Sequence, residues 1–196
     1  MITIGLTGGI GSGKTTVAGI IEVMDIPVYY TDLEAKRIMA ESPVVKEELT
    51  AMFGEEVYPG GRLNKPYLAS LIFNNEANLH YVNSVVHPEV RKDFLQWKEK
   101  HTNREAVVVE SAILFESGLE QSVDIKVTVT APLEVRVERV MKRDNVDRQS
   151  ILDRMANQLT EEERIKRSDK QIVNDNHHAL IPQVEDILQN VRIFAR

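Results

Sequence analysis

A glycine-rich loop near the start of the chain carries the clearest chemical signal in the sequence. Residues Gly8 to Thr15 read GGIGSGKT, the spacing of a phosphate-binding loop (P-loop). Glycine backbones can turn successive N–H groups inward around an anionic phosphate, and the following helix adds the positive end of its dipole. Lys14 would supply a point charge to the β- and γ-phosphates, and the Thr15 hydroxyl would bind Mg²⁺. We therefore predict a nucleotide phosphate site formed by Gly8, Gly9, Gly11, Ser12, Gly13, Lys14, Thr15 and Thr16.

Three carboxylates follow apolar, strand-like segments, and two of them are candidates for phosphoryl transfer. Asp32, Glu110 and Glu116 lie just beyond such segments, where parallel sheets place their ligands. We expect Asp32 to act as the base that accepts a proton from an acceptor hydroxyl. The alternative for Asp32 is a helix N-cap. Glu110 is predicted to hold Mg²⁺ through water, and its alternative is a paired structural carboxylate.

An arginine-rich stretch follows later in the chain. Residues 136–154 contain six basic and four acidic side chains within a protein of net charge −6. Arg136, Arg139 and Arg143 recur at helical spacing and share one face, and Arg154 falls in the next predicted helix. Such a stretch can close over a triphosphate as a lid, with Arg139 and Arg143 neutralising charge on the transferred group. The alternative is an ordinary solvated helix face.

Alternating apolar and helical segments predict the elements that position these residues. Strand-like segments separated by ten or more helical residues are typical of a parallel sheet with helices on both faces, an α/β fold. The last of these strands precedes a terminal helix from about residue 177 to 194. The predicted strands are 2–7, 27–30, 106–109, 125–130 and 171–173.

Two regions interrupt this alternation and are predicted to be helical. Residues 43–101 contain no convincing strand, and Asn64-Lys65-Pro66 is typical of a helix start. The His87-Pro88 pair is expected to break a long helix in two. The second region covers 133–169, where Thr160 opens a capping box for one more helix.

Composition narrows the class of protein. The chain has 196 residues, which suits one domain, and lacks cysteine, which excludes disulfide scaffolds and thiolate metal sites. A net charge of −6 argues against a nucleic-acid binder. The start of the sequence does not have the pattern of a signal peptide, and no apolar run has the length of a membrane helix. We expect a cytoplasmic protein without membrane or nucleic-acid partners, either a monomer or a small homo-oligomer.

The chain resembles the dephospho-CoA kinase family over nearly its whole length. Its glycine loop matches the family pattern, which is more restrictive than a bare P-loop, and several further motifs appear in the same order. The matching segments are Gly5–Lys14, Asp32 with Glu34-Ala35, His87-Pro88 with Val90, Leu114–Glu116, Arg139–Asp144, Arg154–Gln158 and Ile172–Asn176.

The resemblance implies a P-loop NTPase of the nucleoside-monophosphate-kinase type, a three-layer α/β/α single domain over 1–196. Its nucleotide-binding core would take about 1–42, 102–132 and 170–196, with an acceptor-binding lobe at 43–101 and a lid at 133–169. The implied reaction is transfer of the γ-phosphoryl group of MgATP to the ribose 3′-hydroxyl of dephospho-CoA, giving coenzyme A and ADP.

The resemblance also assigns roles to individual residues. Asp32 would be the base, and Lys14, Arg139 and Arg143 would stabilise the transferred charge; Arg143 and Asn174 would also contact the nucleotide. The implied acceptor-binding residues are Asp32, Lys65, His87, Arg91, Glu110 and Arg154.

The sequence departs from the family pattern at two places. Glu110-Ser111-Ala112 stands where the family often has Asp-x-Pro, and Asn64-Lys65 replaces a frequent Asp-Arg pair. A lysine keeps a point charge for phosphate but cannot make the bidentate contact of arginine. Two alternative functions are a kinase for another small acceptor, such as a nucleotide or a sugar acid, and a nucleotide-dependent switch without an acceptor.

Overall fold

The computed structural model describes residues 1–73 and 75–194. Two compact units are formed, one from residues 1–30 together with 98–196 and the other from residues 31–97. Within the described residues, no helix is both long enough and apolar enough to cross a membrane.

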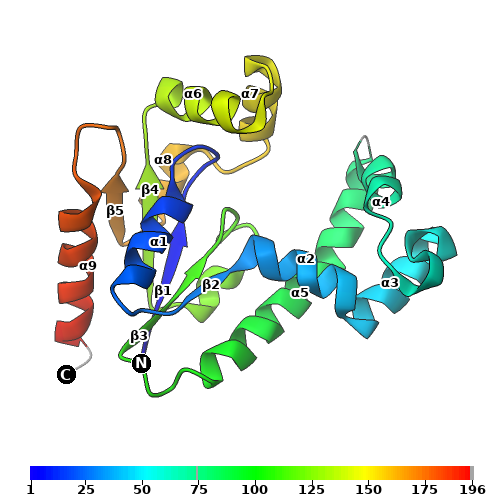
Figure 1. Ribbon diagram of the computed structural model, residues 1–196, viewed down its shortest axis with the longest axis horizontal. Helices are drawn as coiled ribbons and strands as arrows, with labels where there is room; N and C mark the ends of the chain where they lie inside the picture. Colours follow the sequence, from blue (N-terminus) through cyan, green and yellow to red (C-terminus); the bar gives the residue numbers. More distant parts are fainter. Residues whose placement is uncertain (74, 195–196) are drawn as a thin grey trace. The chain divides into compact units, whose positions relative to one another are not determined.

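The first unit is built on a five-stranded parallel sheet with the order β2-β3-β1-β4-β5 (Figure 1). The predicted strands are confirmed to within one residue at each end. Burial on both faces explains their composition: β3 reads AVVVE and is buried at every position. The strands are β1 (Ile2–Thr7), β2 (Val28–Tyr30), β3 (Ala106–Glu110), β4 (Ile125–Thr130) and β5 (Lys170–Val173).

The register of the sheet brings the carboxyl ends of the strands to one edge. Glu110 at the end of β3 is the partner of Leu6 in β1 and of Tyr30 in β2. Thr7 is the partner of Thr128 in β4. The loop after β1 and the carboxylate that ends β3 therefore emerge side by side, as expected for ligand sites in parallel sheets.

Helices flank this sheet and close its core. The helix α1 (Lys14–Val23) packs against β1, β3 and β4, and also against α9 (Leu180–Phe194), which itself packs on β5 (Figure 1). The short helix α8 (Glu161–Lys166) lies against β4. The turn η3 (Leu119–Ser122) and the helices α6 (Leu133–Asp144) and α7 (Arg148–Ala156) complete the unit. The predicted helix start at Thr160 is confirmed, because the Thr160 hydroxyl accepts the N–H of Glu163 at 3.2 Å, which is one of the two hydrogen bonds of a capping box.

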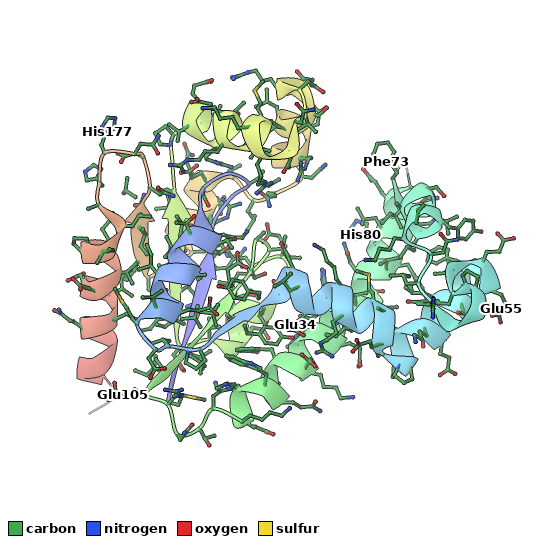
Figure 2. All side chains as sticks on the ribbon, in the orientation of Figure 1. Glu34, Glu55, Phe73, His80, Glu105 and His177 are labelled. Atoms are coloured by element: carbon green, nitrogen blue, oxygen red, sulfur yellow. The ribbon has the colours of Figure 1, made fainter. Side chains whose placement is uncertain are left out.

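The described residues of the second unit form helices joined by short turns and contain no strand, as predicted for residues 43–101. Ser42 caps α3 by accepting the N–H of Val45, and Asn64 caps α4 by accepting the N–H of Tyr67. Phe73 follows α4 and is 83% exposed (Figure 2). The elements are α2 (Thr31–Glu41), α3 (Pro43–Phe53), η1 (Glu55–Val57), η2 (Pro59–Gly61), α4 (Lys65–Ile72) and α5 (Glu76–Glu99).

The predicted helix break at His87-Pro88 is wrong. The helix α5 runs without interruption through Pro88, which costs one backbone hydrogen bond and some strain. A row of buried side chains continues on both sides of the proline at four-residue spacing, so packing keeps the two halves aligned and outweighs the local penalty. These buried residues are Val82, Val86, Val90 and Phe94.

Candidate active site

The glycine loop forms a tight turn between β1 and α1. Gly11 and Gly13 have φ values of 80° and 86°, a left-handed backbone that side chains with a Cβ rarely adopt. The helix α1 begins at Lys14, directly after Gly13. The positive end of α1 therefore points at the loop, in the arrangement that binds phosphate.

The two polar residues that follow the last glycine of the loop contact the carboxylate that ends β3. Lys14 Nζ lies 3.0 Å from Glu110 Oε1, and the Thr15 hydroxyl donates to the same oxygen at 3.4 Å. Glu110 is only 3% exposed, so its charge needs this compensation. The hydroxyl and carboxylate oxygens that Mg²⁺ favours therefore stand next to each other, and these residues fit a magnesium ion that keeps several of its waters.

Arg139 and Asn174 hold the outer side of the loop. Arg139 Nη1 donates to the carbonyl oxygens of Gly11 and Ser12 at 3.5 and 3.4 Å, and its Nη2 donates to Asn174 and Asn176. Asn174 Nδ2 donates to the Ser12 carbonyl at 2.8 Å. The structure thus brings both residues to the P-loop, although they lie more than 120 positions away from it in the sequence.

Asn174 and Asn176 belong to the turn between β5 and α9, on which His177 is also placed (Figure 2). Asp175 organises this turn by accepting the N–H groups of His177 and His178, each at 2.9 Å. These backbone N–H groups hold the pKa of the Asp175 carboxyl well below its ordinary value. The turn that presents the two asparagines to Arg139 therefore has its own internal support.

Arg143 and Arg154 meet at a different place, the carboxylate of Asp144. Arg143 Nε and Arg154 Nη1 lie 2.6 and 3.0 Å from its oxygens. Hydrogen bonds from both guanidinium groups, that of Arg143 first, lower the pKa of Asp144 far below its ordinary value. Two of the arginines predicted for the lid, one on α6 and one on α7, are thus held together by the carboxylate of the last residue of α6.

Two further arginines are buried beside the loop: Arg136, which the predicted lid included without a role of its own, and Arg164, which was not predicted. They are 7% and 2% exposed. Arg136 Nε donates to the carbonyl of Ile10 at 2.9 Å, and Arg164 Nη2 donates to the carbonyl of Leu159. Burial is the largest influence on Arg164 and lowers its pKa. The helical spacing of the arginines had pointed to Arg136, whereas no sequence signal is apparent for Arg164.

Four of the six predicted acceptor-binding residues belong to the second unit, whereas Glu110 and Arg154 belong to the first. Asp32 is exposed in the first turn of α2, which begins one residue earlier, and Lys65 is the exposed first residue of α4. His87 and Arg91 lie one turn apart on α5 and are partly buried. Burial first, and the charge of Arg91 second, lower the pKa of His87 from its ordinary 6.5, so its neutral form is favoured.

The strand order and the loop define the class of this protein. A parallel sheet with a P-loop between its central strand and the first helix is the fold of P-loop NTPases. The family model of dephospho-CoA kinase matches residues 2–179. The chain therefore belongs to the dephospho-CoA kinase family.

A curated relative supports this assignment, and two solved structures have the same fold. A dephospho-CoA kinase of Bacteroides fragilis is 44% identical over 187 residues, which cover 95% of this chain and 91% of the relative. A Thermus thermophilus structure has a TM-score of 0.80 at 37% identity and covers 98% of this chain and 97% of its own. A dephospho-CoA kinase structure from Campylobacter jejuni has a TM-score of 0.73 at 22% identity, covering 99% and 98% of the two chains, and supports the fold.

Proposed function

We propose that this protein transfers the γ-phosphoryl group of ATP to the ribose 3′-hydroxyl of dephospho-CoA, yielding coenzyme A and ADP. The observation that carries the proposal is the family match over residues 2–179. The P-loop supports it, since Lys14, Thr15 and the N-terminus of α1 form a site suited to nucleotide phosphates.

The donor nucleotide is bound by the P-loop residues from Gly8 to Thr16. On binding, Lys14 exchanges its contact with Glu110 for the β- and γ-phosphates, whose negative charge takes the place of the carboxylate. Thr15 and, through water, Glu110 would hold Mg²⁺, which would supply positive charge to the phosphates during transfer. Asn174 and Arg143 contact the nucleotide from the side of β5 and α6.

Asp32 accepts the proton of the acceptor hydroxyl. Its support is its place in the chain, two residues after β2, which pairs with β3 at Glu110. As the 3′-oxygen forms its bond to phosphorus, the bond from phosphorus to the leaving oxygen of ADP breaks and the proton moves to Asp32. Lys14, Arg139 and Arg143 stabilise the charge that spreads over the transferred group.

Two helical regions of the chain bind the acceptor and cover the nucleotide. The acceptor-binding lobe takes residues 43–101, where Lys65, His87 and Arg91 bind dephospho-CoA together with Asp32 and Glu110. The lid takes residues 133–169 and includes Arg154, and its closure keeps water away from the phosphoryl group. The core takes 1–42, 102–132 and 170–196. We further propose a cytoplasmic location, no nucleic-acid partner, and a monomer or small homo-oligomer.

The test is ADP formation from MgATP with and without dephospho-CoA. We expect the acceptor to stimulate ADP formation strongly and to gain a phosphate at its ribose 3′-position. Equal stimulation by nucleotides or sugar acids would support a kinase with another acceptor. A slow ATPase that dephospho-CoA does not accelerate would support a nucleotide-dependent switch. Either of these last two outcomes contradicts the proposal.

A further inference from the structure

The backbone of Ile10, at the tip of the P-loop, is held by side chains that come from outside the loop. Its N–H donates to Gln158 Oε1 at 3.1 Å, and its carbonyl accepts from Arg136 Nε at 2.9 Å. Its side chain packs against the apolar cluster between α6 and α7. We propose that Arg136 is a positioning residue of the nucleotide site, which fixes the peptide between Ile10 and Gly11 in the orientation that receives phosphate.

Planarity of the peptide group explains why this orientation matters. In a trans peptide the C=O and the next N–H point in opposite directions, and the described residues contain no cis bond. When Arg136 holds the Ile10 carbonyl on the outer side of the loop, the N–H of Gly11 is directed to the inner side. Asn174 does the same for the N–H of Gly13 by holding the Ser12 carbonyl at 2.8 Å. Inward N–H groups are what a P-loop offers to phosphate.

Arg136 is itself held in place from two directions. Its Nη1 lies 2.6 Å from Glu161 Oε2, at the start of α8, and the side chain is almost fully buried. The backbone of Arg136 lies so close to Gly11 that a Cβ on this glycine would collide with its carbonyl oxygen. A buried guanidinium with a carboxylate on one side and a carbonyl on the other has little freedom, so it can impose a direction on the loop.

Gly9 shows how closely the guanidinium approaches the loop. A Cβ on Gly9 would collide with Arg136 Nη2 and would lie 3.2 Å from Arg164 Nη1. Two buried positive groups thus lie directly behind a loop that binds anions, where their charge also favours phosphate. The absence of a side chain at Gly9 is what allows this approach.

The inference rests on the proposed binding of MgATP to this loop. A positioning role and a purely structural role for Arg136 lead to different expectations. A structural role predicts lower stability with unchanged nucleotide affinity in the folded enzyme. A positioning role predicts weaker MgATP binding and a higher KM for ATP, with an unchanged KM for dephospho-CoA. The two roles are therefore separated by affinity measured on folded protein.

The experiment measures the Kd for MgATP by titration calorimetry, together with Tm, for Arg136→Met, Arg136→Lys and Glu161→Gln in the full chain. Loss of one charge-assisted hydrogen bond to the loop is expected to raise the Kd about tenfold in Arg136→Met, about 1.4 kcal/mol. Arg136→Lys keeps the positive charge but loses the planar guanidinium group, so its Kd should lie between those of Arg136→Met and the wild type. Arg104→Met is the matched control, because Arg104 lies outside the proposed lid and pairs with Asp25 through a hydrogen bond of 2.7 Å in an exposed pair.

The control should bind MgATP within twofold of the wild type, and Glu161→Gln should bind more weakly than the control. An unchanged Kd in Arg136→Met, or an equal loss of affinity in Arg104→Met, overturns the inference. If Arg136→Met does not fold, the Kd values of Arg136→Lys and Glu161→Gln are compared with that of the control instead. Failure of the wild-type protein to bind MgATP would contradict the proposed function. Binding of MgATP by every variant with the same Kd as the wild type would contradict the inference alone.

Discussion

The ion pair between Lys14 and Glu110 makes a quantitative prediction about Glu110→Gln in the absence of nucleotide. At 3.0 Å the attraction is about 5.5 kcal/mol for an effective dielectric constant of 20, and most of it is offset by the desolvation of both groups. The substitution leaves Lys14, whose side chain is 16% exposed, without its carboxylate. We expect a net loss of about 2 kcal/mol, below the usual cost for a fully buried pair, because Lys14 keeps some contact with solvent. For a protein of this length this corresponds to a decrease in Tm of about 6 °C.

Thermal unfolding with and without ADP, in the absence of Mg²⁺, is the assay. The phosphates of ADP would compensate the charge of Lys14, so ADP should raise the Tm of Glu110→Gln by more than that of the wild type. Glu134→Gln is the control, since its exposed pair with Arg148 should contribute less than about 1 kcal/mol. A Tm for Glu110→Gln that is equal to or higher than that of the wild type without nucleotide would show that the pair contributes no stability and would contradict this prediction.

Three further predictions concern the second unit. Asp32→Asn should keep its affinity for MgATP but lose about 10²–10⁴ of turnover, since it no longer accepts the proton, and a near-normal rate would remove Asp32 from this role. Because the pKa of His87 lies below 6.5 in the folded protein, the unfolded state binds more protons, and stability should fall as the pH drops below 6.5. In urea unfolding, the free energy of unfolding of His87→Gln should decrease less over this pH range than that of the wild type. An identical decrease would show that His87 is not the source of this pH dependence. Pro88→Ala should raise the free energy of unfolding by about 1–3 kcal/mol, because it restores a hydrogen bond within α5. A free energy of unfolding equal to or below that of the wild type would show that the proline is accommodated without cost.

Local patterns were sufficient to predict much of the fold. The β-branched run before Glu110 and the alternating segment 125–130 form strands because their side chains are buried on the sheet. Asn64 and Thr160 begin helices because their side-chain oxygens accept a free N–H of the first turn. The P-loop could be predicted because its function depends on consecutive residues.

What the sequence did not reveal depends on contacts between distant residues. Arg136 reaches Ile10 across 126 positions and Gln158 reaches it across 148, and no local pattern records either contact. The uninterrupted helix through Pro88 has the same origin, since buried residues on both sides of the proline outweigh a local penalty that the sequence displays plainly. The pairing of Lys14 with Glu110 likewise follows from the strand order.

The activity proposed for this chain is phosphorylation of dephospho-CoA. The most direct measurement compares kcat/KM for dephospho-CoA with the values for nucleoside monophosphates and sugar acids at saturating MgATP, and locates the new phosphate by phosphorus NMR. We expect dephospho-CoA to be strongly preferred and the phosphate to appear on its ribose 3′-oxygen. Comparable values for the other acceptors, or a phosphate at another position, would contradict it.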